Sequence, residues 1–186
     1  MAGTASAFAI ELRGVGKAFG EVVALTAINL EVPRLPKVGF VGPSGGGKTT
    51  LLRIVADVLE PDTGLVRAED ATTARQRLAR CALMPQRDLL LPWRTALDNA
   101  AIGLENRGAS RAEARRRTRA FFERLGLAGF ENARPAQLSG GVRQRVGFLR
   151  TLMAGKDIFL LDEPFGALNS ITRSAARDSR ERMSPP

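Results

Sequence analysis

The feature that most constrains this chain is the glycine-rich segment at residues 42–50, which satisfies the spacing G-x-x-x-x-G-K-[ST]. It follows an apolar stretch at residues 38–41, and apolar residues recur at helical spacing from Leu51 to Leu59. A strand, a glycine loop and a helix in this order are the context of a phosphate-binding loop, so an accidental glycine turn is disfavoured. The predicted phosphate-contacting residues are Gly42, Pro43, Ser44, Gly45, Gly46, Gly47, Lys48, Thr49 and Thr50.

Each residue type in this segment has a chemical reason. The glycines allow consecutive backbone amides to turn toward one centre, and the following helix adds the positive potential of its N-terminus. Lys48 is expected to reach the outer phosphates, and the Thr49 hydroxyl is expected to ligate Mg²⁺. The helix is predicted to continue until Pro61 and the turn after it.

The remaining pattern predicts an α/β chain. Residues 8–32 alternate apolar and polar side chains with glycine punctuation, which predicts short antiparallel strands with one buried face. Residues 38–41 predict a buried strand, and residues 158–161 form another continuous apolar strand. After a short apolar run at residues 81–84, the chain to about residue 135 is predicted to be mostly helical, with a capping box formed by Ser110 and Glu113. A further amphipathic helix is predicted after Ser139.

Composition excludes several classes of chemistry. The chain has no histidine and one cysteine, Cys81. Histidine-dependent hydrolases, histidine-ligated metals, internal disulfides and paired-cysteine redox sites are therefore excluded. The chemistry must use carboxylates, amides, hydroxyls, lysine, arginine and the backbone.

The charge balance leaves an alternative open. The formal net charge is +9, and arginines crowd residues 111–119, which indicates nucleic acid or an anionic membrane surface as possible partners. Few aromatic residues and no recognisable nucleic-acid-binding motif stand against nucleic acid. We favour a solvated helix face for this cluster and predict no nucleic-acid partner.

Two acidic residues follow the strand at 158–161. Parallel sheets present ligand-binding groups where their strands end, so Asp162 is predicted to hold Mg²⁺ and Glu163 to deprotonate an attacking water. Two acids that merely end a strand are the alternative, but the phosphate loop in the same chain favours the functional interpretation.

Four ordered motifs now make a resemblance plain: the chain resembles the ATP-binding subunit of an ABC transporter. They are the phosphate loop, a glutamine loop at Gln86, the signature LSGGVRQR at 138–145, and the strand that ends in Asp162 and Glu163. The resemblance covers residues 8 to about 173, and the signature is its most diagnostic part.

The resemblance implies roles and ligands. It implies ATP and Mg²⁺ as cofactors, with Glu163, Gln86 and Lys48 as catalytic residues. Thr49, Gln86 and Asp162 are the implied metal ligands. Phe19 resembles the aromatic residue that stacks on adenine, although a core phenylalanine is the open alternative. Nucleotide held by the opposite subunit of a homodimer is expected to contact Ser139, Gly140, Gly141 and Gln144.

The segments at 91–99 and 164–168 resemble importers of the nitrate, sulfonate and taurine type. Trp93 lies in the first of them, where a simple packing role is the alternative. The implied partners are a transmembrane permease and, indirectly, a periplasmic or lipoprotein solute-binding protein. No sequence stretch predicts a membrane span or a secretory signal, so the expected location is cytoplasmic, peripheral on the inner face of the cell membrane.

Two departures qualify this expectation. Asn169 stands where the family usually has aspartate, and the chain after residue 173 is polar, without the apolar strand and switch histidine of the family. The expected function is ATP binding and, if the chain is competent, ATP hydrolysis that energises solute import across the cytoplasmic membrane. Because the resemblance implies a subunit truncated before that histidine, we expect it to keep nucleotide contacts but to turn over poorly or not at all. The alternatives are an ATP-binding adaptor without catalysis, a gene fragment, and a basic nucleic-acid binder.

The predicted fold is a P-loop NTPase (RecA-like) parallel core with an N-terminal antiparallel β part, an inserted helical subdomain and missing C-terminal core strands. The ATP-binding domain is expected at residues 1–173, with its helical insertion at about 89–155. Residues 174–186 are expected to be a polar, disordered tail.

Overall fold

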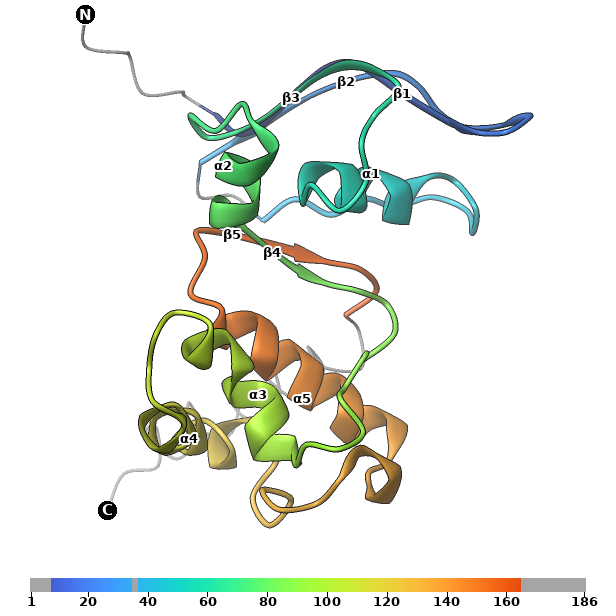
Figure 1. Cartoon of the computed structure of the whole chain (residues 1–186). Helices are drawn as coiled ribbons and strands as arrows, with labels where there is room; N and C mark the ends of the chain where they lie inside the picture. The colour runs from blue at the N-terminus through green and yellow to red at the C-terminus, as the bar shows by residue number, and fades with distance from the viewer. Residues whose placement is uncertain (1–7, 35–36, 165–186) are drawn as a thin grey trace, which may run out of the picture. The chain divides into compact units, whose positions relative to one another are not determined.

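The computed structural model describes residues 8–34 and 37–164 and divides the chain into two compact units. Within the described part, the first unit comprises residues up to 83 together with 156–162, and the second comprises 84–155 with 163 and 164. The predictions for residues 165–168, Asn169 and residues 174–186 lie outside the described residues. Figure 1 labels the elements of both units.

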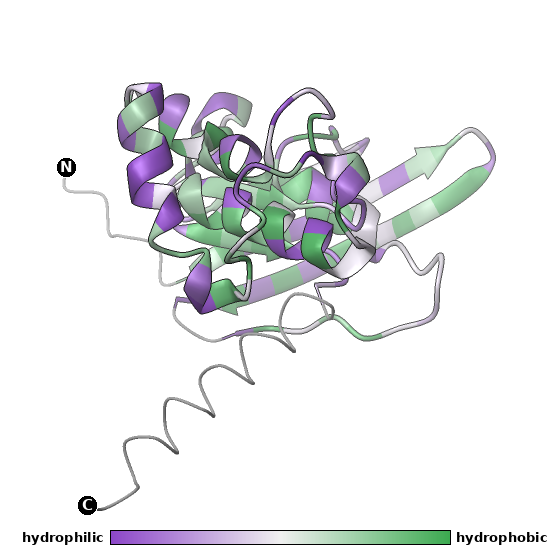
Figure 2. Ribbon diagram, turned by 90° about the horizontal axis from the view of Figure 1, so that it is seen from below, coloured by the Kyte–Doolittle hydropathy of each residue, from purple (hydrophilic) through white to green (hydrophobic). Residues whose placement is uncertain are grey.

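The first unit is built on a three-stranded antiparallel sheet in the order β2-β1-β3. Its strands are β1 (Phe8–Phe19), β2 (Val22–Pro33) and β3 (Thr63–Ala68). β3 pairs only with the stretch of β1 from Ile10 to Gly16, so the far ends of β1 and β2 run out together as a ribbon (Figure 2). The predicted antiparallel β part is therefore confirmed.

Helix α1 (Lys48–Val55) covers one face of this sheet (Figure 1). Leu51, Leu52, Ile54 and Val55 are buried with side chains of β1 and β3 in one hydrophobic core. Helix α2 (Ala74–Arg80) and the paired strands β4 (Cys81–Met84) and β5 (Ile158–Leu161) complete the unit. Cys81, Ile158 and Leu160 join the same core.

Helix α1 is shorter than its apolar spacing predicted. It ends at Val55, and Val58, one of the apolar residues at helical spacing between Leu51 and Leu59, is 63% exposed. Asp57 adopts a left-handed conformation with φ 60°, and its carboxylate forms an ion pair with Arg77 of α2. The pairing of Asp57 with a distant helix fixes the point where the chain leaves α1, which local periodicity does not encode.

The strand predicted at residues 38–41 is wrong. Residues 37–43 have no strand assignment, and Val38, Phe40 and Val41 are exposed. A strand needs a neighbour that completes its ladder of hydrogen bonds, and no described residue pairs with this stretch. Apolar composition alone was therefore an insufficient reason to predict a buried strand.

The second unit is helical. Its elements are α3 (Ala96–Glu105), α4 (Arg111–Arg119), the 3₁₀ turns η1 (Glu123–Leu125) and η2 (Pro135–Gln137), and α5 (Gly140–Met153). Figure 1 shows α3 lying along α5, and Ala101, Leu104 and Ala114 form a small core where α3 meets α4. Val142, Val146 and Leu149 of α5 are buried, as their helical spacing predicted.

Only half of the predicted capping box of α4 forms. The Ser110 hydroxyl accepts a hydrogen bond from the Glu113 amide, at 3.3 Å. The Glu113 carboxylate instead accepts from Arg116, whose Nε lies 2.9 Å from Oε2. A charged guanidinium is a stronger donor than a backbone amide, which explains the exchange of partners.

The α/β class predicted from the sequence is confirmed.

Candidate functional site

The glycine loop turns tightly before α1 in the first unit. The Gly46 amide donates to the Pro43 carbonyl at 3.1 Å, and Gly45 and Gly47 have φ values of 78° and 76°. A Cβ atom at Gly47 would lie 2.6 Å from the carbonyl oxygen of Ala24, which is too close for any side chain. Glycine at this position therefore allows the loop to pack against β2.

The Lys48 ammonium lies over its own loop. Its Nζ donates to the carbonyl oxygens of Gly42 at 2.9 Å and Pro43 at 2.8 Å. An ammonium has three N–H donors, so these two bonds orient the group and leave a third for an anionic ligand. The positive charge is held at the N-terminus of α1, where the helix dipole also favours an anion.

Thr49 and Asp162 are brought together, although they lie 113 residues apart. The Thr49 Oγ1 hydroxyl donates to Asp162 Oδ2 at 2.8 Å. Strand β5 ends at Leu161 and so places the buried Asp162 carboxylate beside the start of α1. A hydroxyl and a carboxylate are the hard oxygen ligands that Mg²⁺ prefers, so the pair fits a magnesium ion.

Gln86 and Glu163 are brought together in the second unit. Gln86 Nε2 donates to Glu163 Oε2 at 2.6 Å. Glu163 is exposed and has a left-handed backbone, with φ 53°. This conformation is uncommon for a residue with a side chain and is typical of functional turns.

The signature segment forms the start of α5. Ser139 is its N-cap, and the hydroxyl accepts from the Val142 amide at 3.4 Å. Gly140 and Gly141 are exposed in the first turn, and Gln144 is half-buried one turn later. The first amides of this 14-residue helix therefore lie at a surface, with no side chain at Gly140 or Gly141 to screen them from an anion.

Two aromatic residues with open alternatives are exposed. Phe19, at the end of β1, is 51% exposed, and the Lys17 ammonium lies 5.7 Å from its ring centroid. Trp93 is 69% exposed. The alternatives of a core phenylalanine and a packing tryptophan are therefore wrong.

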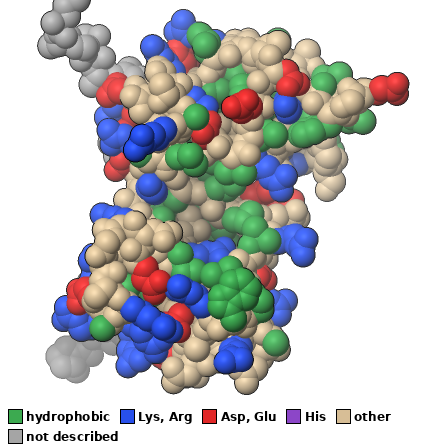
Figure 3. Space-filling view, in the orientation of Figure 1, with side chains coloured by type: hydrophobic (Ala, Val, Ile, Leu, Met, Phe, Trp, Pro, Cys, Tyr) green, Lys and Arg blue, Asp and Glu red, His purple; other side chains and the backbone are tan. Residues whose placement is uncertain are grey.

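The arginine cluster is only partly a solvated face. Arg111 and Arg115 both bind the carboxylate of Asp98, which is buried on α3. Burial raises the pKa of Asp98, but hydrogen bonds from Arg111, Arg115 and Thr95 outweigh it and hold that pKa below its ordinary value. The exposed remainder includes Arg117 and Arg119, and Figure 3 shows basic side chains gathered over α4.

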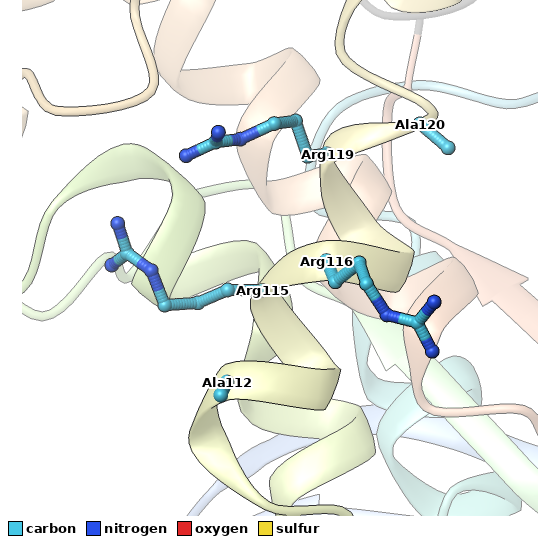
Figure 4. Close-up of a pocket in the computed structure, with 5 residues that line it drawn as sticks. All are labelled: Ala112, Arg115, Arg116, Arg119 and Ala120. Carbon is cyan, nitrogen blue, oxygen red and sulfur yellow. The ribbon is translucent and has the colours of Figure 1, made fainter.

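One face of α4 is hollowed between arginine side chains. The hollow has a volume of about 600 Å³, and Figure 4 shows its lining: Ala112, Arg115, Arg116, Arg119 and Ala120. Arg115 and Arg116 already bind carboxylates, Asp98 and Glu113 respectively. The charge available to an external polyanion is therefore smaller than the sequence indicates.

Sequence reasoning missed the polar residues that hold the helical unit together. Asp98 and Asn99 are buried in α3, and Arg143 and Arg150 of α5 bind the segment after Gln86. Polar residues within an otherwise apolar helical stretch at 96–104 were the available signal, because buried polar groups require partners.

In the described part of the chain, no helix has both the length and the apolar character needed to cross a membrane.

The chain is similar to ATP-binding proteins of import systems. The aliphatic sulfonates import ATP-binding protein SsuB 1 of Rhodococcus jostii is 41% identical over 94% of this chain and 67% of that protein. The taurine import ATP-binding protein TauB of Pseudomonas savastanoi pv. phaseolicola is 39% identical over 91% of this chain and 65% of that protein. The chain spans 48% of a similar protein, the sulfate/thiosulfate import ATP-binding protein CysA of Synechocystis.

Solved structures give the same assignment. The dimeric structure of MJ0796, a bacterial ABC transporter cassette, superposes with a TM-score of 0.78 at 31% identity, over 93% of this chain and 84% of that one. A structure of the same cassette bound to ADP and Pi matches equally well. Residues 25–166 match the family described as ABC transporter. The predicted resemblance is thereby confirmed, and the chain belongs to the ABC transporter family, among its ATP-binding subunits.

Proposed function

We propose that this chain binds ATP with Mg²⁺ and hydrolyses it to energise solute import through a membrane permease. The observation that supports this most directly is the preformed pair of Thr49 and Asp162, with Oγ1 and Oδ2 2.8 Å apart, beside the Lys48 loop. The glycine loop and the Thr49–Asp162 oxygen pair both lie at the start of α1, which supports the binding of a nucleotide's phosphates together with their magnesium.

In the proposed reaction, water attacks the γ-phosphorus and the bond to the β–γ bridging oxygen breaks, giving ADP and phosphate. Glu163 accepts the proton of the attacking water, Gln86 orients that water, and Lys48 stabilises the charge that develops on the phosphate oxygens. Magnesium, when bound, neutralises charge on the β- and γ-phosphates. Phe19 stacks on the adenine ring, for which its exposed position at the end of β1 is suitable.

The proposed assembly is a homodimer that docks on a transmembrane permease at the inner face of the cell membrane. The exposed first turn of α5 at Ser139, Gly140 and Gly141 supports a role in binding the γ-phosphate of nucleotide held by the opposite subunit. Similar proteins are named for sulfonate, taurine and sulfate import, so a sulfur-containing oxyanion is the proposed solute class. A solute-binding protein acts indirectly, through the permease.

The test separates binding from hydrolysis. Titration with a fluorescent ATP analogue should give saturable binding that Lys48→Ala weakens by roughly tenfold to a hundredfold, the value of a charge-assisted hydrogen bond. Arg53→Ala, a charge removal on the exposed side of the same helix, should leave the affinity unchanged. Phosphate release should accompany binding in the wild type and disappear in Glu163→Gln. Binding without release would support a non-hydrolysing adaptor, and no binding would overturn the proposed function.

A further inference from the structure

Two arginines of α5 bind the segment that follows Gln86. Arg150 donates from Nη2 to the Asp88 carbonyl at 2.7 Å and from Nη1 to the Leu89 carbonyl at 2.8 Å. Arg143 donates from Nε to the Asp88 carboxylate at 3.0 Å and from Nη1 to the Leu138 carbonyl at 2.9 Å. Asp88 and Leu89 are thus held on the helix that Ser139 caps.

The arrangement at position 150 suits a guanidinium. Its two terminal nitrogens each bind one of two successive carbonyls from fixed positions in one plane, whereas a lysine ammonium, which can also bind two carbonyls as Lys48 does, would have to bind both from a single atom. Burial lowers the pKa of Arg150 below its ordinary value, although the nearby Asp88 charge opposes this effect. The guanidinium nevertheless remains protonated. A half-buried cation is therefore satisfied by backbone oxygens of the segment that it fixes.

The backbone at Leu89 shows why the segment needs support. Leu89 has φ 45°, a left-handed conformation that is uncommon and strained for a residue with a side chain. The bond from Arg150 to the Leu89 carbonyl helps to hold this conformation. Gly147 of α5 also packs against this segment: a Cβ atom at Gly147 would lie 3.6 Å from the Asp88 carbonyl oxygen.

The far end of the segment is held by α3. The fully buried Asn99 accepts from the Leu91 amide at 2.7 Å and donates to the Leu91 carbonyl at 3.1 Å. The Asn99 side-chain Nδ2 also donates to the carbonyls of Arg94 and Thr95, at 3.2 and 3.0 Å. Residues 88–95 are therefore fixed at one end by α5 and at the other by α3.

We propose that Arg150, supported by Arg143, is a positioning residue for Gln86. Gln86 lies two residues before the Asp88 carbonyl that Arg150 binds, and its amide donates to Glu163 in the same unit. The Arg150 guanidinium fixes the backbone just after Gln86, and so the position from which the Gln86 side chain extends. It also links this segment to α5, the helix that begins at the signature. This inference rests on the proposed ATP hydrolysis for its kinetic consequence and on the contacts of residues 86–89 for its structural one.

The kinetic test compares Arg150→Lys and Arg150→Gln with Arg119→Gln, which removes one exposed arginine from α4 in the same unit. Both Arg150 variants should lower kcat roughly tenfold to a hundredfold, as a misplaced catalytic group does, with KM for ATP changed by less than about twofold. Arg119→Gln should behave as the wild type. An unchanged kcat in both Arg150 variants would overturn the proposal.

A double-mutant cycle distinguishes positioning from general support of the fold. If Arg150 acts through Gln86, adding Arg150→Lys to Gln86→Ala should produce no further loss of kcat, because the positioned group is already absent. A merely structural arginine would give a further loss of the same size in both backgrounds. That additive outcome would contradict the positioning role.

A structural measurement remains informative if the protein does not hydrolyse ATP. Amide hydrogen exchange at residues 88–91 should become at least about tenfold faster in Arg150→Lys, because the paired hydrogen bonds to the Asp88 and Leu89 carbonyls are lost. Exchange within α1 should stay unchanged. If exchange is faster in the variant but the wild-type protein does not hydrolyse ATP, the structural role of Arg150 stands and the proposed function is rejected. If the exchange rates at residues 88–91 in both Arg150 variants equal those of the wild type, the structural role of Arg150 is itself rejected.

Discussion

The Gln86 side-chain amide donates a 2.6 Å hydrogen bond to the Glu163 carboxylate, although 77 residues separate them. The contact joins the glutamine loop to the residue proposed as the base. A carboxylate has several acceptor positions, so this bond orients the group and leaves capacity to accept a proton from water. The pair suggests a first prediction about catalysis.

Glu163→Gln should abolish phosphate release while retaining nucleotide binding. An amide keeps the shape and a hydrogen-bonding oxygen for Gln86 but has no basicity, so the rate should fall by about 10²–10⁴-fold. Steady-state phosphate release and nucleotide titration on the same preparation check both parts. Glu123→Gln, at an exposed position of η1, is the matched control and should be unaffected. A Glu163→Gln rate within threefold or so of the wild type would exclude Glu163 as the base.

Thr49→Val should remove the magnesium-dependent part of nucleotide affinity. Valine keeps the branched shape but has no hydroxyl, so the Asp162 carboxylate loses its 2.8 Å donor and the metal loses a ligand. Titration with a fluorescent ATP analogue should show a weaker affinity than the wild type in Mg²⁺ and the same affinity in EDTA. Thr49→Ser restores the hydroxyl and should restore the magnesium effect; failure to do so would contradict this account.

Gly47→Ala should destabilise the first unit more than Gly45→Ala. Both glycines have φ near the left-handed region, at 76° and 78°, so each substitution costs about 1–2 kcal/mol in backbone strain. A Cβ at Gly47 also meets the Ala24 carbonyl at 2.6 Å, whereas nothing lies within 4 Å of one at Gly45. Thermal denaturation of the two variants measures the difference, and equal melting temperatures would show that the loop does not pack on β2 as described.

Asp98→Asn should lower the free energy of unfolding at pH 7 by about 1–3 kcal/mol, because the buried partner of two arginines loses its charge. The pKa of Asp98 lies below the ordinary 3.8, so its contribution is present above pH 3.8 and is lost as the pH falls through the lower folded value. Urea unfolding of wild type and variant should therefore converge in acid. Asp157→Asn removes an exposed partner of Arg80, and because solvent screens this ion pair, the free energy of unfolding should be nearly unchanged. Equal losses in the two variants would contradict the role of burial.

Phe40→Ser should leave the stability nearly unchanged, within about 0.5 kcal/mol, because Phe40 is exposed. Leu12→Ala, in the core of the first unit, should cost about 2–5 kcal/mol. Chemical denaturation of both variants distinguishes the exposed stretch observed from the buried strand that the sequence predicted. A large loss on Phe40→Ser would restore the sequence-based prediction.

Local sequence was sufficient for the parts of the molecule whose structure depends on near neighbours. The glycine loop before α1, the N-cap of α5 at Ser139 and the strand that ends just before Asp162 follow from spacing and from residue type. Helix α2 was missed even though Thr73 and Gln76 form a full capping box, which was a readable signal. Strand β3 was missed because the turn residues at 62–64 obscured a strand that begins within the turn.

The sequence by itself determined the family, the α/β class and the identity of the candidate residues, because these depend on motifs and on local periodicity. Only the tertiary structure decided which residues meet: Thr49 with Asp162, Gln86 with Glu163, and Arg150 with the carbonyls of Asp88 and Leu89. It also decided that residues 38–41 form no strand and that Asp98 is the partner of two arginines. The physical reason is that strand pairing and buried-charge pairing depend on groups distant in the chain, whereas helix caps and glycine loops depend on groups a few residues away.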